Sequence, residues 1–491
     1  MHPFTSLYIF LLCAVFNSHA EETKPHGKSS LVVGLSHVRS LFTPSMGLLN
    51  STSYDFLDII EPVTAYTDGY LLSLNLGTPP QTFQVYLDTG SDLTWVPCGT
   101  SSYQCIECDN SERSSSKPTP TFSPSQSSTN TRDLCGSRFC ADVHSSDNRY
   151  DPCAAAGCSI AAFTGGLCPR TCPPFSYTYG GGALVLGSLS RDAVTLHGSI
   201  HGSSSSSSSS SGPLPVQFPG FCFGCVGSSI REPIGIAGFG KGTLSLPSQL
   251  GLLDKGGFSH CFLGFRFARN PNISSPLVMG DLALSATDGF LFTPMLKSVT
   301  YPNFYYIGLD GVSIGGDGTA AAVTNAAPPS LSSIDPGGNG GVLVDTGTTY
   351  THLPDPFYAS IMSSISSMVP TNYSRSHELE ARTGFDLCYK IPCARGPCTE
   401  DELPLVSLHL AGGDNNKLLT LPKQSCYYPV SAPKDGVVVK CLLFQRMDQD
   451  DDTTSGPGAV LGSFQMQNVE VIYDLEMARI GFLPRDCALQ A

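Results

Sequence analysis

The sequence lacks long hydrophobic runs and is poor in tryptophan and in charge. Only one of the 491 residues is Trp, and only 14% are charged. No apolar stretch reaches the roughly 20 residues of a membrane-spanning helix, and no heptad repeat predicts a coiled coil. Basic residues are also scarce: 27 Lys and Arg stand against 41 Asp and Glu, which gives a net charge of −14. Such an acidic chain is poorly suited to nucleic acid or anionic membranes, and we expect neither as a partner.

Glycine and proline, by contrast, are abundant. The chain has 50 Gly and 37 Pro, while 41% of its residues are hydrophobic, enough for a packed core. This composition predicts a mostly β fold of short strands joined by turns. Residues 71–77 and 82–88 read as a hairpin. The best helix follows Pro354, with Asp355 as its N-cap and Pro356 as its first residue.

The N-terminus has the features of a secreted protein. Residues 7–16 (LYIFLLCAVF) are apolar and precede Ser18-His19-Ala20, which predicts a signal peptide over 1–20. The Cys-free residues 21–65 are predicted to be a propeptide, with an ordinary N-terminal extension as the alternative. The polar C-terminus argues against a lipid anchor. We therefore expect the secretory pathway, with the extracellular space (apoplast or cell wall) favoured over the vacuole.

Cysteine usage agrees with secretion. Of 19 Cys, Cys13 falls in the signal peptide; twelve of the others lie between residues 98 and 261 and six between 388 and 487. Because both numbers are even, we expect each half to close its own disulfides. The pairs at 105/108 and 222/225 have zinc-knuckle spacing. Neither has a matching second pair, so disulfides are preferred and no metal is expected.

Three further features suggest surface segments. Residues 98–172 carry nine Cys among polar residues, which predicts a disulfide-stapled insertion rather than a domain with its own apolar core. Nine serines at 203–211 predict a flexible loop. Asn50, Asn272 and Asn372 begin glycosylation sequons, as expected for a secreted glycoprotein.

An internal repeat supplies the chemistry. Residues 85–91 (VYLDTGS) are matched 257 residues later by 342–348 (VLVDTGT). Each copy is an apolar strand that runs into Asp-Thr-Gly and a hydroxyl residue. Each is followed at a distance by an apolar strand with Gly, at 234–240 (IGIAGFG) and 459–464 (AVLGSF). Two such matched pairs suggest one copy in each of two lobes.

Two facing loops of this kind would form a catalytic centre. Each glycine lets its loop turn sharply, and each threonine hydroxyl can bond across to the other loop. Two carboxyls in contact cannot both ionise, so they share a proton. The charged member can then activate water while the protonated member polarises a carbonyl, with no metal, cofactor or covalent intermediate. The residues concerned are Asp88, Thr89, Gly90, Ser91, Asp345, Thr346, Gly347 and Thr348.

These motifs resemble those of pepsin-type aspartic proteases. The stretch DTGSDLTWVPC (88–98) is similar to the first-site signature of that family, and in particular of its atypical plant branch of nucellin-like and nepenthesin-like enzymes. The resemblance covers about residues 68–487. It implies a bilobal, mostly antiparallel β fold with a cleft between lobes at 66–290 and 291–491. It also implies Asp88 and Asp345 as the catalytic pair, with Ser91 and Thr348 bonding their outer oxygens.

The resemblance extends to the flap that closes over substrate. Trp95 lies where the tryptophan of the family bonds the flap tyrosine, and Tyr179 occupies the flap position. The sequence departs from the plant pattern at residues 180–183 (GGGA), where many relatives have Asp and Ser. Three glycines predict a more flexible flap tip with fewer contacts to substrate. The saposin-like insert of typical plant vacuolar enzymes is absent.

Rival chemistries are weaker. Residues 311–315 (GVSIG) match the serine-hydrolase elbow, but no capped helix follows, so we interpret them as a hairpin strand. His352 follows the second acid loop without a Ser or Cys nucleophile beside it, which favours a structural role. Glycosidase chemistry would also use two carboxyls, yet no aromatic sugar platform is evident.

Taken together, the sequence predicts a secreted, monomeric aspartic endopeptidase, made as a zymogen and most active in acid, with proteins or peptides as substrates. The alternative is a non-catalytic protein of the same fold, such as a glycosidase inhibitor or a seed-globulin-like protein. The intact acid loops and Tyr179 favour the enzyme.

Overall fold

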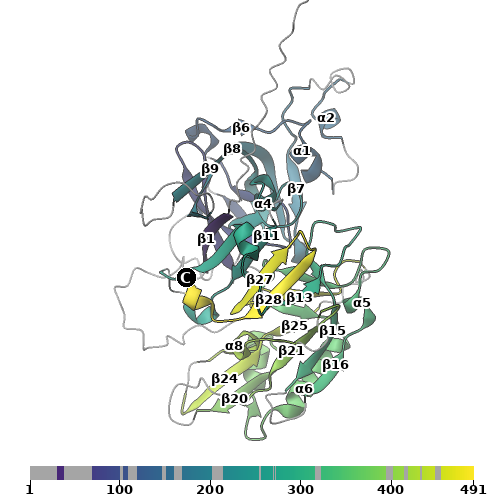
Figure 1. Cartoon of the computed structure of the whole chain (residues 1–491). Coiled ribbons are helices and arrows are strands. Elements are labelled where there is room, and N and C mark those ends of the chain that lie inside the picture. Colours follow the sequence, from purple (N-terminus) through teal and green to yellow (C-terminus); the bar gives the residue numbers. More distant parts are fainter. Residues whose placement is uncertain are drawn as a thin grey trace, which may run out of the picture.

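The fold comes from a computed structural model that describes residues 30–37, 69–99, 103–108, 119–145, 151–159, 168–201, 214–253, 256–268, 270, 272–315, 322–393, 402–413, 418–431, 434–447 and 455–490. The predicted signal peptide, Asn50, the serine loop at 203–211 and most of 21–65 lie outside this range. Two lobes lie one above the other in Figure 1, and the yellow C-terminal strands run between them. The predicted mostly β, two-lobed architecture is confirmed.

The first twelve strands are β1 (Ser30–His37), β2 (Tyr70–Leu76), β3 (Gln81–Asp88), β4 (Trp95–Pro97), β5 (Gln104–Ile106), β6 (Thr131–Arg132), β7 (Phe175–Thr178), β8 (Leu184–His201), β9 (Leu214–Ile230), β10 (Gly235–Gly238), β11 (Gly257–Cys261) and β12 (Ser275–Gly280). Short helices accompany them at α1 (Arg138–Val143), α2 (Pro152–Ala155) and α4 (Leu246–Gln249). The predicted hairpin is confirmed, because β2 and β3 pair in antiparallel register around the turn at 77–80.

The remaining strands are β13 (Leu291–Pro294), β14 (Tyr306–Ile307), β15 (Leu309–Ile314), β16 (Val323–Ala326), β17 (Val342–Asp345), β18 (Thr351–Leu353), β19 (Ser374–Arg375), β20 (Cys388–Pro392), β21 (Val406–Leu410), β22 (Leu419–Thr420), β23 (Tyr427–Pro429), β24 (Val437–Leu442), β25 (Phe444–Arg446), β26 (Ala459–Gly462), β27 (Val469–Asp474) and β28 (Arg479–Pro484). The helices here are α5 (Pro329–Ser332), α6 (Phe357–Met368), α7 (His377–Thr383) and α8 (Lys423–Cys426).

A continuous sheet joins the two lobes. Its order runs β13-β28-β27-β11-β12-β1-β2-β3-β10-β4-β9-β8-β6, so strands from the C-terminus pair directly with strands from the first half. The strand β1, which falls inside the predicted propeptide, lies in this sheet between β12 and β2. Its Leu31, Val33 and Leu35 are buried. This part of residues 21–65 therefore contributes to the core of the described structure.

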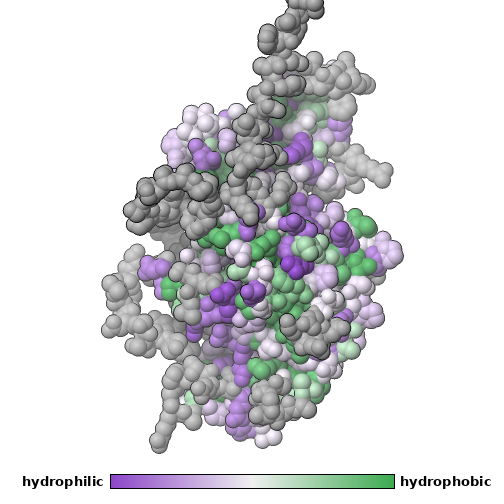
Figure 2. Space-filling view, viewed as in Figure 1, coloured by the Kyte–Doolittle hydropathy of each residue, from purple (hydrophilic) through white to green (hydrophobic). Residues whose placement is uncertain are grey.

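The two largest apolar clusters of the described residues lie against the sheets. The larger one runs through both lobes, because strands of each half contribute to the shared sheet. The smaller one surrounds Trp95 and includes Phe139 and Val143 of helix α1 from the Cys-rich insertion. The insertion thus shares an apolar cluster with the body of the protein. In Figure 2 polar and apolar residues are mixed on the visible face. Among the described residues, no helix has the length and hydrophobicity needed to cross a bilayer.

The disulfides correct one prediction. Cys261 of β11 is bonded to Cys487 near the C-terminus, so a bridge crosses between the two predicted sets. Cys222 and Cys426 are buried free thiols. The expectation that each half closes its own bridges is therefore wrong. Even numbers only permit pairing, whereas a bond needs two cysteines brought within about 4 Å between Cβ atoms, and the shared sheet does this for Cys261 and Cys487.

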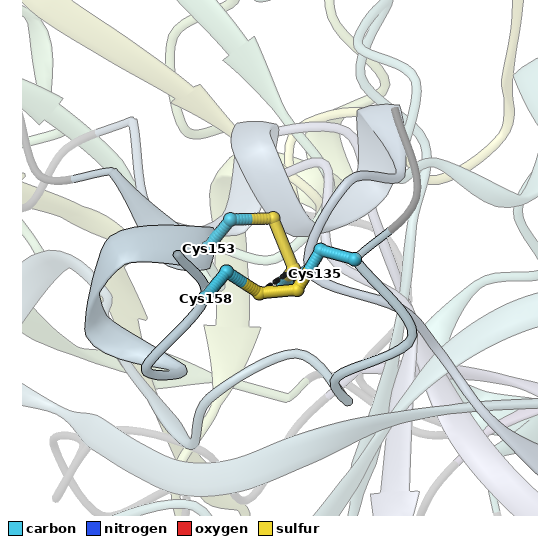
Figure 3. A group of neighbouring side chains, drawn as sticks. Cys135, Cys153 and Cys158 are labelled. Atoms are coloured by element: carbon cyan, nitrogen blue, oxygen red, sulfur yellow. Dashed lines mark hydrogen bonds between the residues drawn. A yellow bond between two sulfur atoms is a disulfide. The ribbon is translucent and has the colours of Figure 1, made fainter. Parts of the chain in front are cut away.

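The Cys-rich insertion is stapled as predicted. Cys135 is bonded to Cys153 and Cys158 to Cys168, while Cys140 is bonded to Cys172. Figure 3 shows the Cys135–Cys153 bond with the sulfur of Cys158 beside it, 3.9 Å from that of Cys135. The four sulfurs of the first two bridges lie within 4.8 Å of one another, close enough for a metal site. Because metals bind thiolates and these sulfurs are in disulfides, we assign the cluster a structural role.

The other pairs with zinc-like spacing are also in disulfides. Cys105 bonds Cys108, and Cys225 bonds Cys98.

The predicted helix exists with a different start. Helix α6 begins at Phe357, Pro356 is its N-cap residue, and no side chain caps it. Asp355 instead accepts a hydrogen bond from Arg446. The assignment of Asp355 as N-cap was wrong because a tertiary ion pair takes its carboxylate. The predicted hairpin strand at 311–315 is confirmed, since β15 pairs with β16.

Candidate active site

Each Asp of the repeat ends a strand that is held between its neighbours. Asp88 closes β3 and lies in parallel register with Gly238 of β10. Asp345 closes β17 and lies in the same register with Gly462 of β26. The apolar strand that follows each acid loop in sequence therefore supports that loop in space. Because both carboxyls project from ends of supported strands, their positions are fixed by the sheets.

The hydrogen bonds within the two loops correspond one to one. The Gly90 amide donates to Asp88 Oδ1 at 2.9 Å, and the Ser91 hydroxyl donates to Asp88 Oδ2. In the second loop the Gly347 amide donates to Asp345 Oδ1 at 2.8 Å, and the Thr348 hydroxyl donates to Asp345 Oδ2 at 2.6 Å. Each carboxyl is thus held by one amide and one hydroxyl.

The threonines bond reciprocally across the loops. The Thr89 amide donates to Thr346 Oγ1 at 3.0 Å, and the Thr346 hydroxyl donates to the Leu87 carbonyl at 2.8 Å. The mirror-related pair runs from the Thr346 amide to Thr89 Oγ1 at 3.0 Å and from the Thr89 hydroxyl to the Val344 carbonyl at 2.9 Å. These four buried bonds bring residues 257 apart in sequence into one unit.

The glycines allow the carboxyls to approach. A Cβ on Gly90 would lie 2.6 Å from Asp345 Oδ1, and one on Gly347 would clash with Asp88 Oδ1. Each glycine therefore faces the carboxyl of the opposite loop. Close approach of the backbone, rather than an unusual φ, is what requires glycine here.

The two carboxyls differ in their surroundings. Asp88 is only 6% exposed, whereas Asp345 is partly exposed. Burial, followed by the charge of Asp345, holds the pKa of Asp88 well above its usual range. Hydrogen bonds from Ser91 and Gly90 oppose that shift without cancelling it. The geometry thus favours a pair that retains a proton.

The flap hairpin carries Tyr179, whose pKa is influenced by the charge of Asp88. Strands β7 and β8 form this hairpin, in which Thr178 pairs with Leu184, and Tyr179 follows β7. The indole N–H of the buried Trp95 donates to the Tyr179 hydroxyl at 2.8 Å. Burial is the main reason why the pKa of Tyr179 is raised, so its hydroxyl stays neutral. This is the pairing that the family resemblance implied for these two residues.

The glycine-rich flap tip has a tether that sequence reasoning missed. Arg231 Nη1 donates to the Gly181 carbonyl at 2.7 Å, and its Nε donates to Glu107 Oε2 at 2.8 Å. Glu107 follows β5 in the Cys-rich insertion. The tip therefore gains through its backbone a contact that its missing side chains cannot make. The sequence signal that could have indicated this tether is the charged Arg231 just before the apolar strand at 234–240.

Two more acidic residues near the site were missed. Asp92 accepts bonds from the Gly242 amide at 2.8 Å and from Asn303 Nδ2 at 2.7 Å, which links the first acid loop to the segment before β14. Glu232 is fully buried, and burial, followed by the charge of Asp88, raises the pKa of its carboxyl to about 9.

The rival motifs have other partners. His352 Nε2 lies 2.7 Å from Gln445 Oε1 across paired strands, as expected for a structural residue. Ser313 Oγ lies 2.6 Å from His409 Nε2, but Ser313 is a residue of strand β15 and not of a strand-to-helix elbow. Asn272 and Asn372 are exposed, and their glycosylation stays a prediction.

Two family descriptions match this chain, one in each half. The family descriptions "Xylanase inhibitor N-terminal" and "Xylanase inhibitor C-terminal" match residues 70–281 and 304–484. A probable aspartyl protease of Arabidopsis thaliana is 35% identical, with 87% of this chain and 84% of the relative covered. This chain belongs to the pepsin-like aspartic proteases. Nepenthesin-2 of Nepenthes gracilis, a further aspartic proteinase, is 27% identical and covers 90% of this chain and 83% of its own.

Solved structures support the same fold. Conglutin gamma, a basic 7S globulin from lupine seeds, has a TM-score of 0.58 at 18% identity and covers 95% of this chain and 98% of its own. The basic 7S globulin from soybean gives the same TM-score and identity, with 94% and 98% covered. At this identity these proteins show the fold alone. The predicted pepsin-like, bilobal fold of this aspartic protease is confirmed.

Proposed function

We propose that Asp88 and Asp345 form the catalytic dyad of this aspartic endopeptidase. The observation that carries the proposal is the matched hydrogen bonding of the two carboxyls on loops locked by Thr89 and Thr346. Seven disulfides among the described residues are typical of the secretory pathway. Within that pathway we favour the extracellular space and a monomer as the working form.

Hydrolysis follows from a dyad that holds one proton. Its ionised carboxyl takes a proton from a water molecule placed between the two loops, while the protonated carboxyl donates a hydrogen bond to the substrate carbonyl. The water oxygen then adds to the carbonyl carbon. Proton transfer to the amide nitrogen breaks the C–N bond and releases an acid and an amine. No covalent bond to the protein forms.

Tyr179 on the flap and Trp95 on β4 support this reaction. The Trp95 indole fixes the Tyr179 hydroxyl, and the charge of Asp88 contributes to the raised pKa of that hydroxyl. A closed flap would exclude bulk water from the peptide and strengthen the hydrogen bonds made to it. Arg231 helps to order this cover by holding the Gly181 carbonyl.

The test is cleavage of a denatured protein between about pH 3 and 7, with and without pepstatin, beside an Asp88→Asn variant. Activity should be highest in acid and should fall as the pH rises and the dyad loses its shared proton. The variant should lose about 10³-fold or more of the activity, because general acid–base catalysis by the dyad is removed. Activity that is full at pH 8 and absent at pH 4, or that survives in the variant, would contradict the proposal.

The non-catalytic alternative makes the opposite prediction. A folded, correctly processed protein with no cleavage at any pH would support a binding protein such as a glycosidase inhibitor. The named protease relatives favour the enzyme.

A further inference from the structure

The disulfide between Cys105 and Cys108 closes the smallest loop of the seven bridges that the structure describes. Its cysteines are 3 residues apart, whereas those of the other six bridges are 10 to 226 residues apart. A short loop restricts the unfolded chain least, so this bridge should contribute least to the stability of the fold. The Cys-x-x-Cys spacing is also one that redox-active thiol pairs use. These features favour a reactive role over a structural one.

The bridge is also open to attack from outside. Of the seven described bridges, five contain at least one buried cysteine. In the other two, Cys105–Cys108 and Cys158–Cys168, both cysteines are partly exposed. Thiol–disulfide exchange begins when an external thiolate reaches a sulfur of the bridge, so exposed bridges are the labile ones. Accessibility thus narrows the candidates for exchange to these two bridges.

The smaller of these bridges lies level with the flap in the same sheet. Ile106, between its two cysteines, pairs with Ile230 of β9, and Ile230 pairs with Leu184 of β8, the second strand of the flap hairpin. Strand β5 runs parallel to β9, and β8 runs antiparallel to it. The flap tip therefore lies at the same end of the sheet as Glu107 and Arg231, which follow Ile106 and Ile230 in the chain.

Both of these charged residues have a left-handed backbone. The φ angle is +57° at Glu107 and +62° at Arg231, a region that residues with a side chain rarely adopt. Such a conformation persists only where the surrounding structure imposes it. At Glu107 the disulfide closes the turn around the residue, and the Arg231 amide donates to the Ile106 carbonyl at 2.8 Å. Opening the bridge removes the covalent part of this constraint, so Glu107 can return to an ordinary conformation.

Arg231 transmits this conformation to the flap. Its Nη1 donates to the Gly181 carbonyl at 2.7 Å, while its Nε donates to Glu107 Oε2 at 2.8 Å. The same guanidinium thus holds the flap tip and is oriented by Glu107. The ion pair is exposed, with 45% of the Arg231 side chain and 56% of the Glu107 side chain accessible. Because exposed ion pairs are weak, their loss should loosen the flap rather than release it.

A second contact joins the same loop to the flap. Tyr103 lies two residues before Cys105, and its hydroxyl donates to the Glu232 carbonyl at 2.8 Å. The centroid of its ring is 6.4 Å from that of Trp95. The Trp95 indole in turn donates to the Tyr179 hydroxyl at 2.8 Å. Residues 103–108 are therefore linked both to the tip of the flap and to its tyrosine.

We propose that Cys105 and Cys108 form a thiol–disulfide exchange site, at which a dithiol reductant opens the bridge and thereby loosens the flap. A thiolate of the reductant attacks one sulfur of the bridge, forms a mixed disulfide and releases the other cysteine as a thiolate, which takes up a proton. The second thiol of the reductant then loses its proton and displaces the remaining protein sulfur, which is protonated in turn. The protein gains two electrons and two protons, and the reductant becomes a disulfide.

The effect on cleavage rests on the proposed endopeptidase function, whereas the exchange site itself does not. With the bridge open, Glu107 leaves its left-handed conformation, and Arg231 loses the partner that orients it toward Gly181. Substrate then binds under a looser flap, so KM should rise roughly two- to tenfold with kcat little changed. Reoxidation of the two thiols should restore the original KM.

Thiol mapping tests the exchange site without any measurement of activity. The folded protein is incubated with increasing dithiothreitol, its thiols are blocked with iodoacetamide, and the labelled cysteines are located by mass spectrometry. Cys105 and Cys108 should be labelled at a dithiothreitol concentration about tenfold or more below that needed for buried Cys261 and Cys487. Removing the reductant and adding oxidised glutathione before the blocking step should abolish this label. Labelling of Cys105 and Cys108 together with the buried pair, or after it, would overturn the site.

Hydrogen exchange tests the link between the bridge and the flap. Two double variants, Cys105→Ser/Cys108→Ser and Cys158→Ser/Cys168→Ser, each lack one of the exposed bridges. Amides of the flap hairpin, with that of Tyr179 among them, should exchange roughly two- to tenfold faster than in the wild type in the first variant only. Unchanged exchange in the first variant, or equal acceleration in both, would show that the bridge does not hold the flap. Thermal melting checks that both variants fold, and mild reduction of the wild type repeats the comparison without any substitution.

Combination with Arg231→Gln tests the route through the tether. In the wild-type background Cys105→Ser/Cys108→Ser should raise KM by the two- to tenfold given above. In the Arg231→Gln background the same change should raise KM by less than about twofold, because the tether is already lost. A full effect in that background would overturn the route through Arg231. A protein that cleaves no peptide but shows the expected labelling and flap exchange would overturn the endopeptidase function and leave the exchange site standing.

Discussion

The two acid loops have the same internal hydrogen bonds but different neighbours. Around Asp88 lie the flap tyrosine, the single tryptophan and the buried Glu232. Around Asp345 there is no matching flap in the described residues, and the carboxyl is partly exposed. In the aligned repeats Glu232 corresponds to Gly456, although a proline follows in both. The symmetric part therefore carries the two carboxyls proposed as catalytic, while the flap belongs to the asymmetric part of the first lobe.

Substitution of the two loop glycines should have the largest effect on activity and should reveal the difference between the two loops. Gly347→Ala would push a methyl group against buried Asp88, which has little room to retreat, whereas Gly90→Ala would push against the more exposed Asp345. We expect kcat/KM to fall about 10²-fold or more in Gly347→Ala and by less in Gly90→Ala. Gly136→Ala, where a Cβ meets nothing within 4 Å, is the control. Equal losses in the two loops would contradict the asymmetry.

Substitution of the two loop threonines should lower the stability of the protein by similar amounts, because their hydrogen bonds are equivalent. Thr89→Val and Thr346→Val each remove a buried hydroxyl that both donates and accepts across the loops. Each should lower the free energy of unfolding by about 1–3 kcal/mol, as measured by denaturant titration. The double variant should lose less than the sum, because the hydroxyls act as one network. Exposed Thr131→Val should change little. Additive losses would indicate that the two loops are not coupled.

The flap tether should have the smallest effect and no counterpart in the other lobe. Arg231→Gln removes the donor to the Gly181 carbonyl, so we expect KM to rise roughly two- to tenfold with kcat less affected. Arg375→Gln is a matched control, because Arg375 forms a similar surface pair with Glu380 in the C-terminal half. A fall in kcat alone would show that Arg231 acts on the chemistry rather than on flap order.

The local sequence pattern predicted those parts of the site that occur as two similar copies in the chain. The Asp-Thr-Gly loops and the supporting strands at 235–238 and 459–462 are visible because each copy identifies the other. The hairpin of β2 and β3 followed from alternation and turn residues. The catalytic role of the dyad stays a prediction that the experiments above decide.

Features that occur once were harder to predict. Glu232 looks like an ordinary charged residue in a loop, and Arg231 like a surface cation. Asp355 was predicted to be a helix N-cap, but its carboxylate accepts a hydrogen bond from Arg446 instead. In each case the deciding neighbour is remote in sequence.

The amino-acid sequence by itself determined the secreted, β-rich class of the protein, its duplication and the identity of the two paired carboxyls, because these depend on composition and on short repeated patterns. Only the tertiary structure decided that Cys261 bonds Cys487 and that, within the described parts of the chain, Cys222 and Cys426 are free and the buried Glu232 carboxyl has no hydrogen-bond partner. The physical reason is that disulfide pairing and desolvation depend on distances of a few ångströms between segments far apart in the chain, and no local pattern encodes those distances.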